Sequence, residues 1–222
     1  MRMRLAGALQ GVTWLFAAGA VQAADMIALR YVDQDPGGPP YATRILVTPD
    51  FLRMDSGDDA GDFTLLDRHR RLVFNVSRDS KLAMVFAPGT LPPKPAGWKP
   101  RLDANEPARG GRRFTLKVRG VVCSEGIAVR HAMDAARAMA ELKSVLAATQ
   151  YRVWKDSPPA MQHDCDLANQ VWNAGDTLML GLPIEEREFT GRSRTFESES
   201  RQPLNPELFR VPEGLARVNA PS

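Results

Sequence analysis

The sequence has little of what metal sites and common enzymes require: only two cysteines and three histidines occur in 222 residues. His69, His131 and His163 stand too far apart for an HxxxH or HExxH zinc motif. A GxSxG nucleophile turn and a glycine-rich phosphate loop are also missing. We therefore expect no catalytic residue, no metal and no cofactor, unless the fold brings His131 or His163 beside acidic residues.

Long apolar runs are missing as well. No internal segment approaches the roughly 18–20 apolar residues of a membrane-spanning helix, so we expect no integral span in the mature chain. The hydrophobic fraction of 44% and the charged fraction of 25% are ordinary for globular proteins and exclude wholesale disorder.

The N-terminus has the three parts of an export signal. Arg2 and Arg4 supply positive charge, residues 5–20 are apolar, and Val21-Gln22-Ala23 is a small-x-small cleavage box. The alternative is a retained anchor, but glycine and polar residues make the stretch weakly apolar. We predict a signal peptide over residues 1–23, cleavage after Ala23, and a periplasmic protein.

Cleavage also changes the interpretation of the charge. The formal net charge is +3, and losing the two leader arginines reduces it to +1. A nearly neutral chain with interspersed signs lacks the clustered basic excess of nucleic-acid-binding proteins. We therefore expect no nucleic-acid partner.

The two cysteines gain a role in an oxidising compartment. An even pair there is most simply one disulfide, so we predict a bond between Cys123 and Cys165. The alternative, a metal or redox site, requires CxxC spacing or neighbouring ligands, which neither residue has. The acidic turn at residues 55–62 could bind Ca²⁺, but it lacks the register of an EF-hand loop, so we expect no calcium site there.

Alternating apolar and polar residues dominate residues 26–87 and predict an antiparallel meander with one buried face. The expected strands lie at residues 27–32, 41–48, 51–55, 62–67, 72–76 and 82–86. Residues 88–111 are rich in proline, so we interpret them as an irregular arm, with Trp98 attached to the body. Alternation resumes at residues 114–118 and again at 182–190 and 194–200.

A helix is expected over residues 131–148, with an apolar stripe that includes Ala132, Ala135 and Met139. A second short helix is predicted between residue 164 or 166 and Gly175. Residues 123–175 thus form a helical insertion that the disulfide ties to the sheet. We expect residues 24–222 to be a single domain.

Alanine and methionine on the helix leave space that leucine or phenylalanine would fill, which favours an apolar cavity between helix and sheet. The alternative is close packing through small residues. Strand alternation and helical phase alone select the expected lining residues, which are Met84, Phe86, Leu116, Met139, Leu142 and Leu146.

Several segments, in order, resemble a group of uncharacterised exported proteobacterial proteins related to the LolA/LolB lipoprotein carriers. They are residues 44–55 (RILVTPDFLRMD), 62–68, 71–76, 181–185 and 206–214. The resemblance implies a LolA-like half-barrel, an incomplete antiparallel barrel around helices, that holds a lipid or acyl chain with the insertion as a lid. The arm at 88–111 and the insertion at 123–165 depart from the carriers, and no ligand-contacting residue is carried over.

The sequence therefore predicts an α+β protein whose curved antiparallel sheet holds one main helix. The expected function is non-enzymatic binding of a hydrophobic ligand, either a lipid or a lipoprotein acyl chain, on the concave face. The alternative is a structural or envelope-sensing module that binds a protein partner through a sheet edge or the proline-rich arm.

Overall fold

A computed structural model describes residues 25–220, so the predicted signal peptide at 1–23 lies outside the described residues. One twelve-stranded sheet runs in the order β12-β6-β5-β4-β3-β2-β1-β11-β10-β9-β8-β7. Every pairing is antiparallel except that of β12 with β6. The strands are β1 (Asp25–Gln34), β2 (Tyr41–Val47), β3 (Phe51–Asp55), β4 (Phe63–Asp67), β5 (Leu72–Ser77), β6 (Leu82–Phe86), β7 (Pro100–Ala108), β8 (Gly111–Val118), β9 (Val121–Val129), β10 (Leu182–Glu188), β11 (Ser193–Pro203) and β12 (Ala216–Asn219).

The helical segments lie between β9 and β10 in the chain, apart from one near the C-terminus. They are α1 (Met133–Asp156), η1 (Pro159–Met161), α2 (Asp164–Leu167), the π-helical η2 (Ala168–Trp172), η3 (Thr177–Leu180) and η4 (Pro206–Phe209). None of the helices in the described range is long and apolar enough to cross a membrane.

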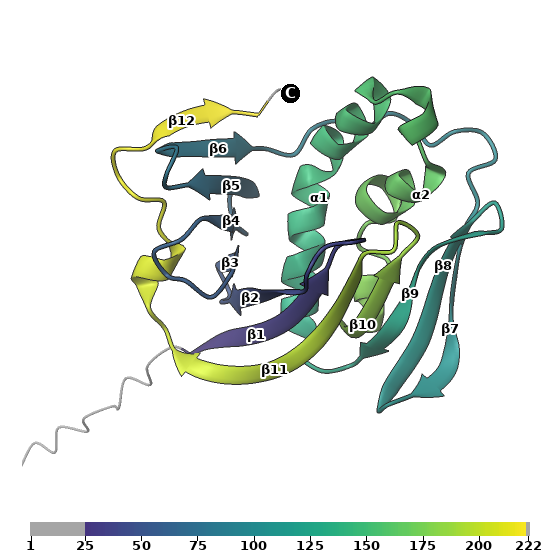
Figure 1. The fold of residues 1–222 in the computed structure, drawn as a ribbon, viewed down its shortest axis with the longest axis horizontal. Helices are drawn as coiled ribbons and strands as arrows, with labels where there is room; N and C mark the ends of the chain where they lie inside the picture. The colour runs from purple at the N-terminus through teal and green to yellow at the C-terminus, as the bar shows by residue number, and fades with distance from the viewer. Residues whose placement is uncertain (1–24, 221–222) are drawn as a thin grey trace, which may run out of the picture.

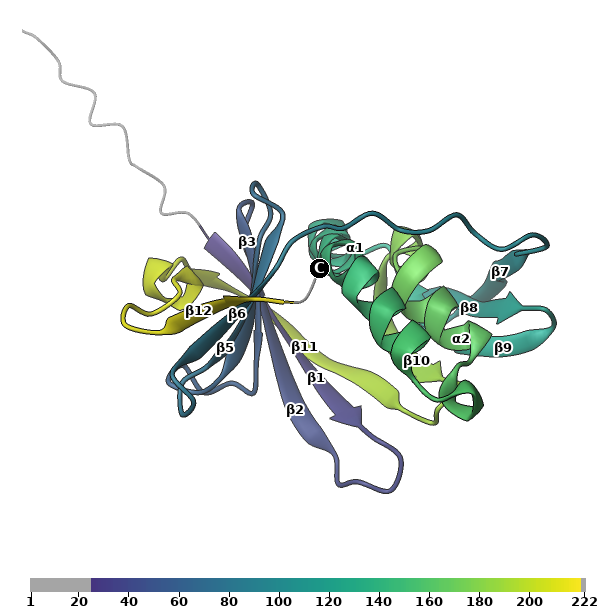
Figure 2. The same cartoon turned by 90° about the horizontal axis from the view of Figure 1, so that it is seen from above.

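The sheet curves around α1, as Figure 1 shows. The long strands β1 and β11 form its base, with β2–β6 and β12 on one side of α1 and β7–β10 on the other. Figure 2 shows the two sides diverging, with the helices beside β7–β10. The two outermost strands, β12 and β7, do not pair with each other in the described chain. The predicted curved, unclosed sheet with one main helix is confirmed.

The concave face packs against α1. Successive residues of a strand point to opposite faces, so Leu29, Ile45 and Leu52 face the helix. They pack with Ala135 and Val145 of α1 in one buried cluster. The small side chains of Ala135 and Ala138 let α1 pack closely against the sheet.

The convex face of the first half is buried too, although the sequence predicted only one buried face. Ala28, Leu46 and Leu65 lie in a second cluster with Leu208 and Phe209. The chain after β11 therefore passes behind the sheet and covers it before β12 pairs with β6. A short, loop-like segment gives no periodic signal, which is why the pattern did not reveal this cover.

Two arginines form ion pairs with carboxylates at the end of β3 and in the acidic turn that follows it. Arg53 is 1% exposed, and its guanidinium bonds Asp55 and the Leu208 carbonyl. Arg44 bonds both Asp55 and Asp59. Burial opposes ionisation of Asp55, but the hydrogen bonds from Arg44 and Arg53 hold its pKa below the usual range. These carboxylates act within an ion-pair network of the fold.

The irregular arm predicted at 88–111 is partly wrong, because residues 100–108 form β7 and pair with β8. β7 is an edge strand, and proline is tolerated there because the outward side needs no backbone donor. Trp98 is attached to the body as predicted. Its indole Nε1 donates to Asn173 Oδ1 at 3.1 Å, and its ring lies edge-on to Trp172.

The helical insertion also begins later than predicted. Cys123 lies inside β9, and α1 starts only at Met133. α1 continues two turns beyond Ala148 to Asp156, because Tyr151 and Trp154 add aromatic contacts near its C-terminus. The predicted disulfide is confirmed, and it joins β9 to α2.

Candidate functional site

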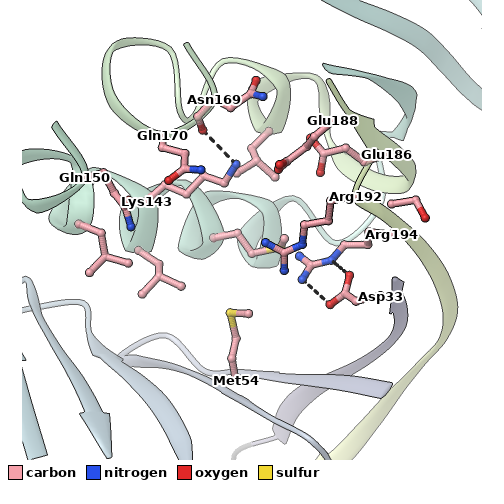
Figure 3. Close-up of a pocket in the computed structure, with 15 residues that line it drawn as sticks. Asp33, Met54, Lys143, Gln150, Asn169, Gln170, Glu186, Glu188, Arg192 and Arg194 are labelled. Carbon is pink, nitrogen blue, oxygen red and sulfur yellow. Dashed lines mark hydrogen bonds and ion pairs between the residues drawn. The ribbon is translucent and has the colours of Figure 1, made fainter. Parts of the chain in front are cut away.

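A cavity of about 260 Å³ lies between α1 and the concave face of the sheet (Figure 3). Its apolar lining comes from Met54 of β3, Met139, Leu142 and Leu146 of α1, and Leu178 of η3. Its polar lining consists of Asp33, Lys143, Gln150, Asn169, Gln170, Glu186, Glu188, Arg192, Ser193 and Arg194. The cavity thus has an apolar wall and a charged side, which we call its mouth and which consists of Asp33, Lys143, Glu186, Glu188, Arg192 and Arg194.

Helical spacing creates the apolar wall. Met139, Leu142 and Leu146 follow each other at intervals of three and four residues, which places them on one side of α1. Met54 points from β3 toward α1, as Figure 3 shows, and lines the same cavity. Two of these side chains are flexible methionines, which adapt to ligands of irregular shape.

Three of the six predicted lining residues lie at the cavity: Met139, Leu142 and Leu146. Phe86 packs against the concave core but lies outside the lining, and Met84 is not in the lining either. Leu116 is 1% exposed in a separate cluster around the disulfide. Alternation predicts the face of a strand, but not which position along the strand adjoins a cavity.

A buried ion pair closes one side of the mouth. The Nε and Nη2 atoms of Arg194 donate to the two carboxylate oxygens of Asp33, at 2.6 and 2.8 Å. The Thr43 hydroxyl donates to the same carboxylate at 2.6 Å. Burial of Asp33 opposes its ionisation, but these hydrogen bonds hold its pKa below the usual range. The sequence did not reveal the pair, because its members are 161 residues apart and meet only through the pairing of β1 with β11.

Glu186 and Glu188 form the other side of the mouth. Residues two apart on a strand share a face, so both carboxylates turn to the cavity. Neither side chain makes a hydrogen bond or an ion pair within residues 25–220. Burial raises the pKa of Glu188, although Lys143 partly opposes the shift. The Lys143 ammonium donates to the Asn169 carbonyl at 3.4 Å.

This arrangement predicts that Glu188→Gln stabilises the protein at neutral pH. A raised pKa in the folded state means that folding disfavours the charged carboxylate, so ionised Glu188 destabilises the fold at pH 7. The penalty fades as pH falls through the folded pKa. We expect a higher melting temperature for the variant at pH 7 and a smaller gap at pH 4. Glu197→Gln, at an exposed position, is the matched control. A lower melting temperature for Glu188→Gln at pH 7 would contradict the account.

A second hollow of about 350 Å³ adjoins the cavity. It shares Asp33, Met54, Arg192 and Arg194 with the first. The rest of its lining is mixed: hydroxyl and amide side chains (Tyr41, Thr43, Ser56, Thr64 and Asn75), two carboxylates (Asp55 and Asp62) and the apolar Ala42 and Phe63. The cavity beside α1 therefore continues into a second hollow beside β2–β5.

The histidines lie apart from the cavity lining. The His69 ring is 2.6 Å from Asp50, and the His131 ring is 2.5 Å from Glu199. His163 lies edge-on to Phe189. The fold thus places His131 beside one acidic residue, but no group of three metal-ligating side chains gathers within the described part of the chain.

No protein-family model and no curated protein sequence matches the chain. Among solved structures, an uncharacterised conserved protein from Thermus thermophilus aligns at 12% identity and a TM-score of 0.44, covering 88% of this chain and 90% of its own. PNGF-II aligns at 12% identity and a TM-score of 0.40, over 89% of this chain. This chain spans about a third of PNGF-II, 31% of its length. A LolA superfamily protein from Nitrosomonas europaea aligns at 9% identity and a TM-score of 0.31, over 86% of this chain and 91% of its own.

Proposed function

We propose that the protein binds the apolar chain of a lipid or a lipoprotein in the cavity between α1 and the concave sheet, without catalysing a reaction. The observation that carries the proposal is the cavity itself, whose apolar wall of Met54, Met139, Leu142, Leu146 and Leu178 faces a charged mouth. Ligand sites combine apolar walls with a few polar groups that fix orientation. The resemblance of several sequence segments to lipoprotein carriers agrees with this.

The volume of the cavity favours a ligand with a single slender apolar chain. Its volume of about 260 Å³ is just below the roughly 300–1,000 Å³ of typical ligand pockets, so it suits part of one chain better than a bulky ring system. The adjoining hollow provides room for the rest of the ligand.

The cavity is held open by fixed contacts on two sides. Arg68, after β4, bonds Glu141 at 2.7 Å and Asp134 at 3.1 Å, and so attaches α1 to the sheet. The disulfide attaches α2 to β9, next to η2, which contributes Asn169 and Gln170 to the lining. A pre-formed site loses less conformational entropy on binding than a flexible one.

We further propose that the protein is exported to the periplasm. Disulfides persist in oxidising compartments and are rare in the cytosol, and the bond between Cys123 and Cys165 fits the export signal predicted at residues 1–23. An apolar ligand carried between membranes needs a binding protein of this kind in an aqueous compartment.

Filling the cavity should weaken binding strongly. We expect Leu146→Trp, which places a larger ring against the apolar wall, to weaken binding of a dansylated fatty acid at least tenfold in a fluorescence titration. Met179→Trp is the matched control, because Met179 is 72% exposed on η3 and does not line the cavity. Equal affinity of the two variants, both folded by circular dichroism, would contradict the proposal.

The alternative function, a module that binds a protein partner through a sheet edge, is favoured by one observation. β7 ends the sheet with an unpaired outer side in the described chain. In that case Leu146→Trp would leave the protein's function intact, so the same variant discriminates between the two.

A further inference from the structure

We propose that the ligand is an amphiphile with a zwitterionic head, whose ammonium group binds Glu186 and Glu188 and whose anionic group binds Lys143 and Arg192. The inference rests on the proposed binding function and specifies the chemical class of the ligand. It depends on the charged side chains at the mouth of the cavity, because binding of an apolar chain alone would not require them.

The mouth is balanced in charge. Three acidic and three basic side chains line it: Asp33, Glu186, Glu188, Lys143, Arg192 and Arg194. Asp33 and Arg194 neutralise each other through two short hydrogen bonds, and Asp33 is 1% exposed. Glu186, Glu188 and Lys143 therefore remain without an ion-pair partner among the described residues, and Arg192 has only the long, exposed pair with Asp35 at 3.5 Å.

The two carboxylates are poised for a cationic group. Both project from β10 toward the cavity, as Figure 3 shows, and their side chains have no hydrogen-bond or ion-pair partner among the described residues. A half-buried carboxylate without a partner gains from a ligand ammonium that replaces its lost water. A neutral head would leave Glu188 desolvated and unpaired.

The two cations come from other elements around the same mouth. Lys143 projects from α1, and its ammonium makes one hydrogen bond in the described chain, the long one to the Asn169 carbonyl. Arg192 lies in the turn before β11, 3.5 Å from Asp35, with its side chain 44% exposed. Both retain donors for a phosphate or carboxylate.

Opposite charges at one mouth discriminate between heads. A purely anionic head would meet repulsion from Glu186 and Glu188, and a purely cationic head would meet repulsion from Lys143 and Arg192. A zwitterion satisfies both sets at once. The selectivity arises from repulsion of the wrong heads as well as attraction of the right one.

Four single-chain palmitoyl or hexadecyl probes test this below their micellar concentrations, by calorimetric titration of the disulfide-bonded protein. They are lysophosphatidylethanolamine, lysophosphatidylglycerol, monopalmitoylglycerol and a hexadecyl betaine. We expect the two zwitterions to bind about tenfold more tightly than the anionic and neutral probes, the gain typical of one charge-assisted hydrogen bond. If only lysophosphatidylethanolamine shows the gain, the site recognises its primary ammonium or its phosphate, whereas an equal gain for the betaine, whose quaternary nitrogen has no N–H, assigns recognition to the paired charges alone.

Variants locate the effect. The double variant Glu186→Gln/Glu188→Gln should lose the roughly tenfold preference for zwitterions over the neutral probe, and Lys143→Gln should reduce it, while Glu197→Gln should keep it. Equal affinity for zwitterionic and neutral probes, or a preference that survives the double variant, overturns this inference and leaves the proposed function standing. Failure of every probe, the neutral one included, overturns the proposed function and this inference with it.

Discussion

Replacing Cys123 and Cys165 by serine is expected to lower the free energy of unfolding by about 4 kcal/mol, because the bond closes a long loop in the unfolded chain. The two cysteines are 42 residues apart in sequence. Both are buried, at 0% and 3% exposure, in the cluster that also contains Trp98 and Leu167. Serine hydroxyls at these positions add the cost of burying polar groups in an apolar cluster.

Urea unfolding of oxidised wild type, reduced wild type and the double variant measures this loss. Both proteins without the bond should have midpoints well below that of the oxidised wild type, with the serine variant the lower of the two because of its buried hydroxyls. Their affinity for a fatty-acid probe should also fall, since α2 and η2 would be held to β9 only by packing and by the hydrogen bond from Asn169 to the Cys123 carbonyl. Equal midpoints for all three proteins would show that the bond does not stabilise the fold.

Replacing Arg194 by methionine is expected to cost about 3–5 kcal/mol at pH 7, because it leaves a buried carboxylate without its charged partner. Asp33 is 1% exposed, and after the change only Thr43 would bond its side chain. The cost should depend on pH. In the wild type the pKa of Asp33 is held below its usual range, so its stabilising contribution is present above the unfolded value of about 3.9 and is lost as pH falls.

In the variant the pKa of Asp33 should rise, so its ionised form destabilises the fold at pH 7 and its protonation relieves the penalty. The difference in unfolding free energy between wild type and Arg194→Met should therefore shrink from pH 7 to pH 4. The double variant Asp33→Asn/Arg194→Met should recover part of the loss. A double variant no more stable than Arg194→Met would contradict an ion-pair role for Asp33.

Much of the fold could be predicted because its strands obey a period of two. β3 and β6 were predicted with the bounds that they have, and β4 and β5 within one residue. The edge strand β7 was missed because proline normally argues against a strand, and its effect depends on which side of the strand lies unpaired. The convex cover at Leu208 and Phe209 was missed because a short irregular segment has no period.

The site was predictable only on its helical side. Met139, Leu142 and Leu146 follow from the phase of α1, and the structure places all three at the cavity. The charged mouth did not follow, because charged residues on a strand are normally interpreted as a solvated face. Glu188 turns inward only because β10 lies between β9 and β11 in a sheet that curves around α1.

Glu188 also illustrates a balance between stability and function. Its burial raises its pKa and costs folding free energy at neutral pH, yet in the proposed account it holds the head of the ligand. A glutamine at this position should therefore stabilise the protein and weaken binding. Opposite changes in the two properties are the expected signature of a binding residue rather than of a core residue.

The most direct test of the account is native mass spectrometry of the disulfide-bonded protein mixed with an equimolar set of single-chain lipids. The account predicts one lipid bound per wild-type chain, enriched in the zwitterionic species, and no bound lipid on Leu146→Trp. Wild-type protein that emerges free of lipid, or that carries the same lipid load as the cavity-filled variant, would contradict it.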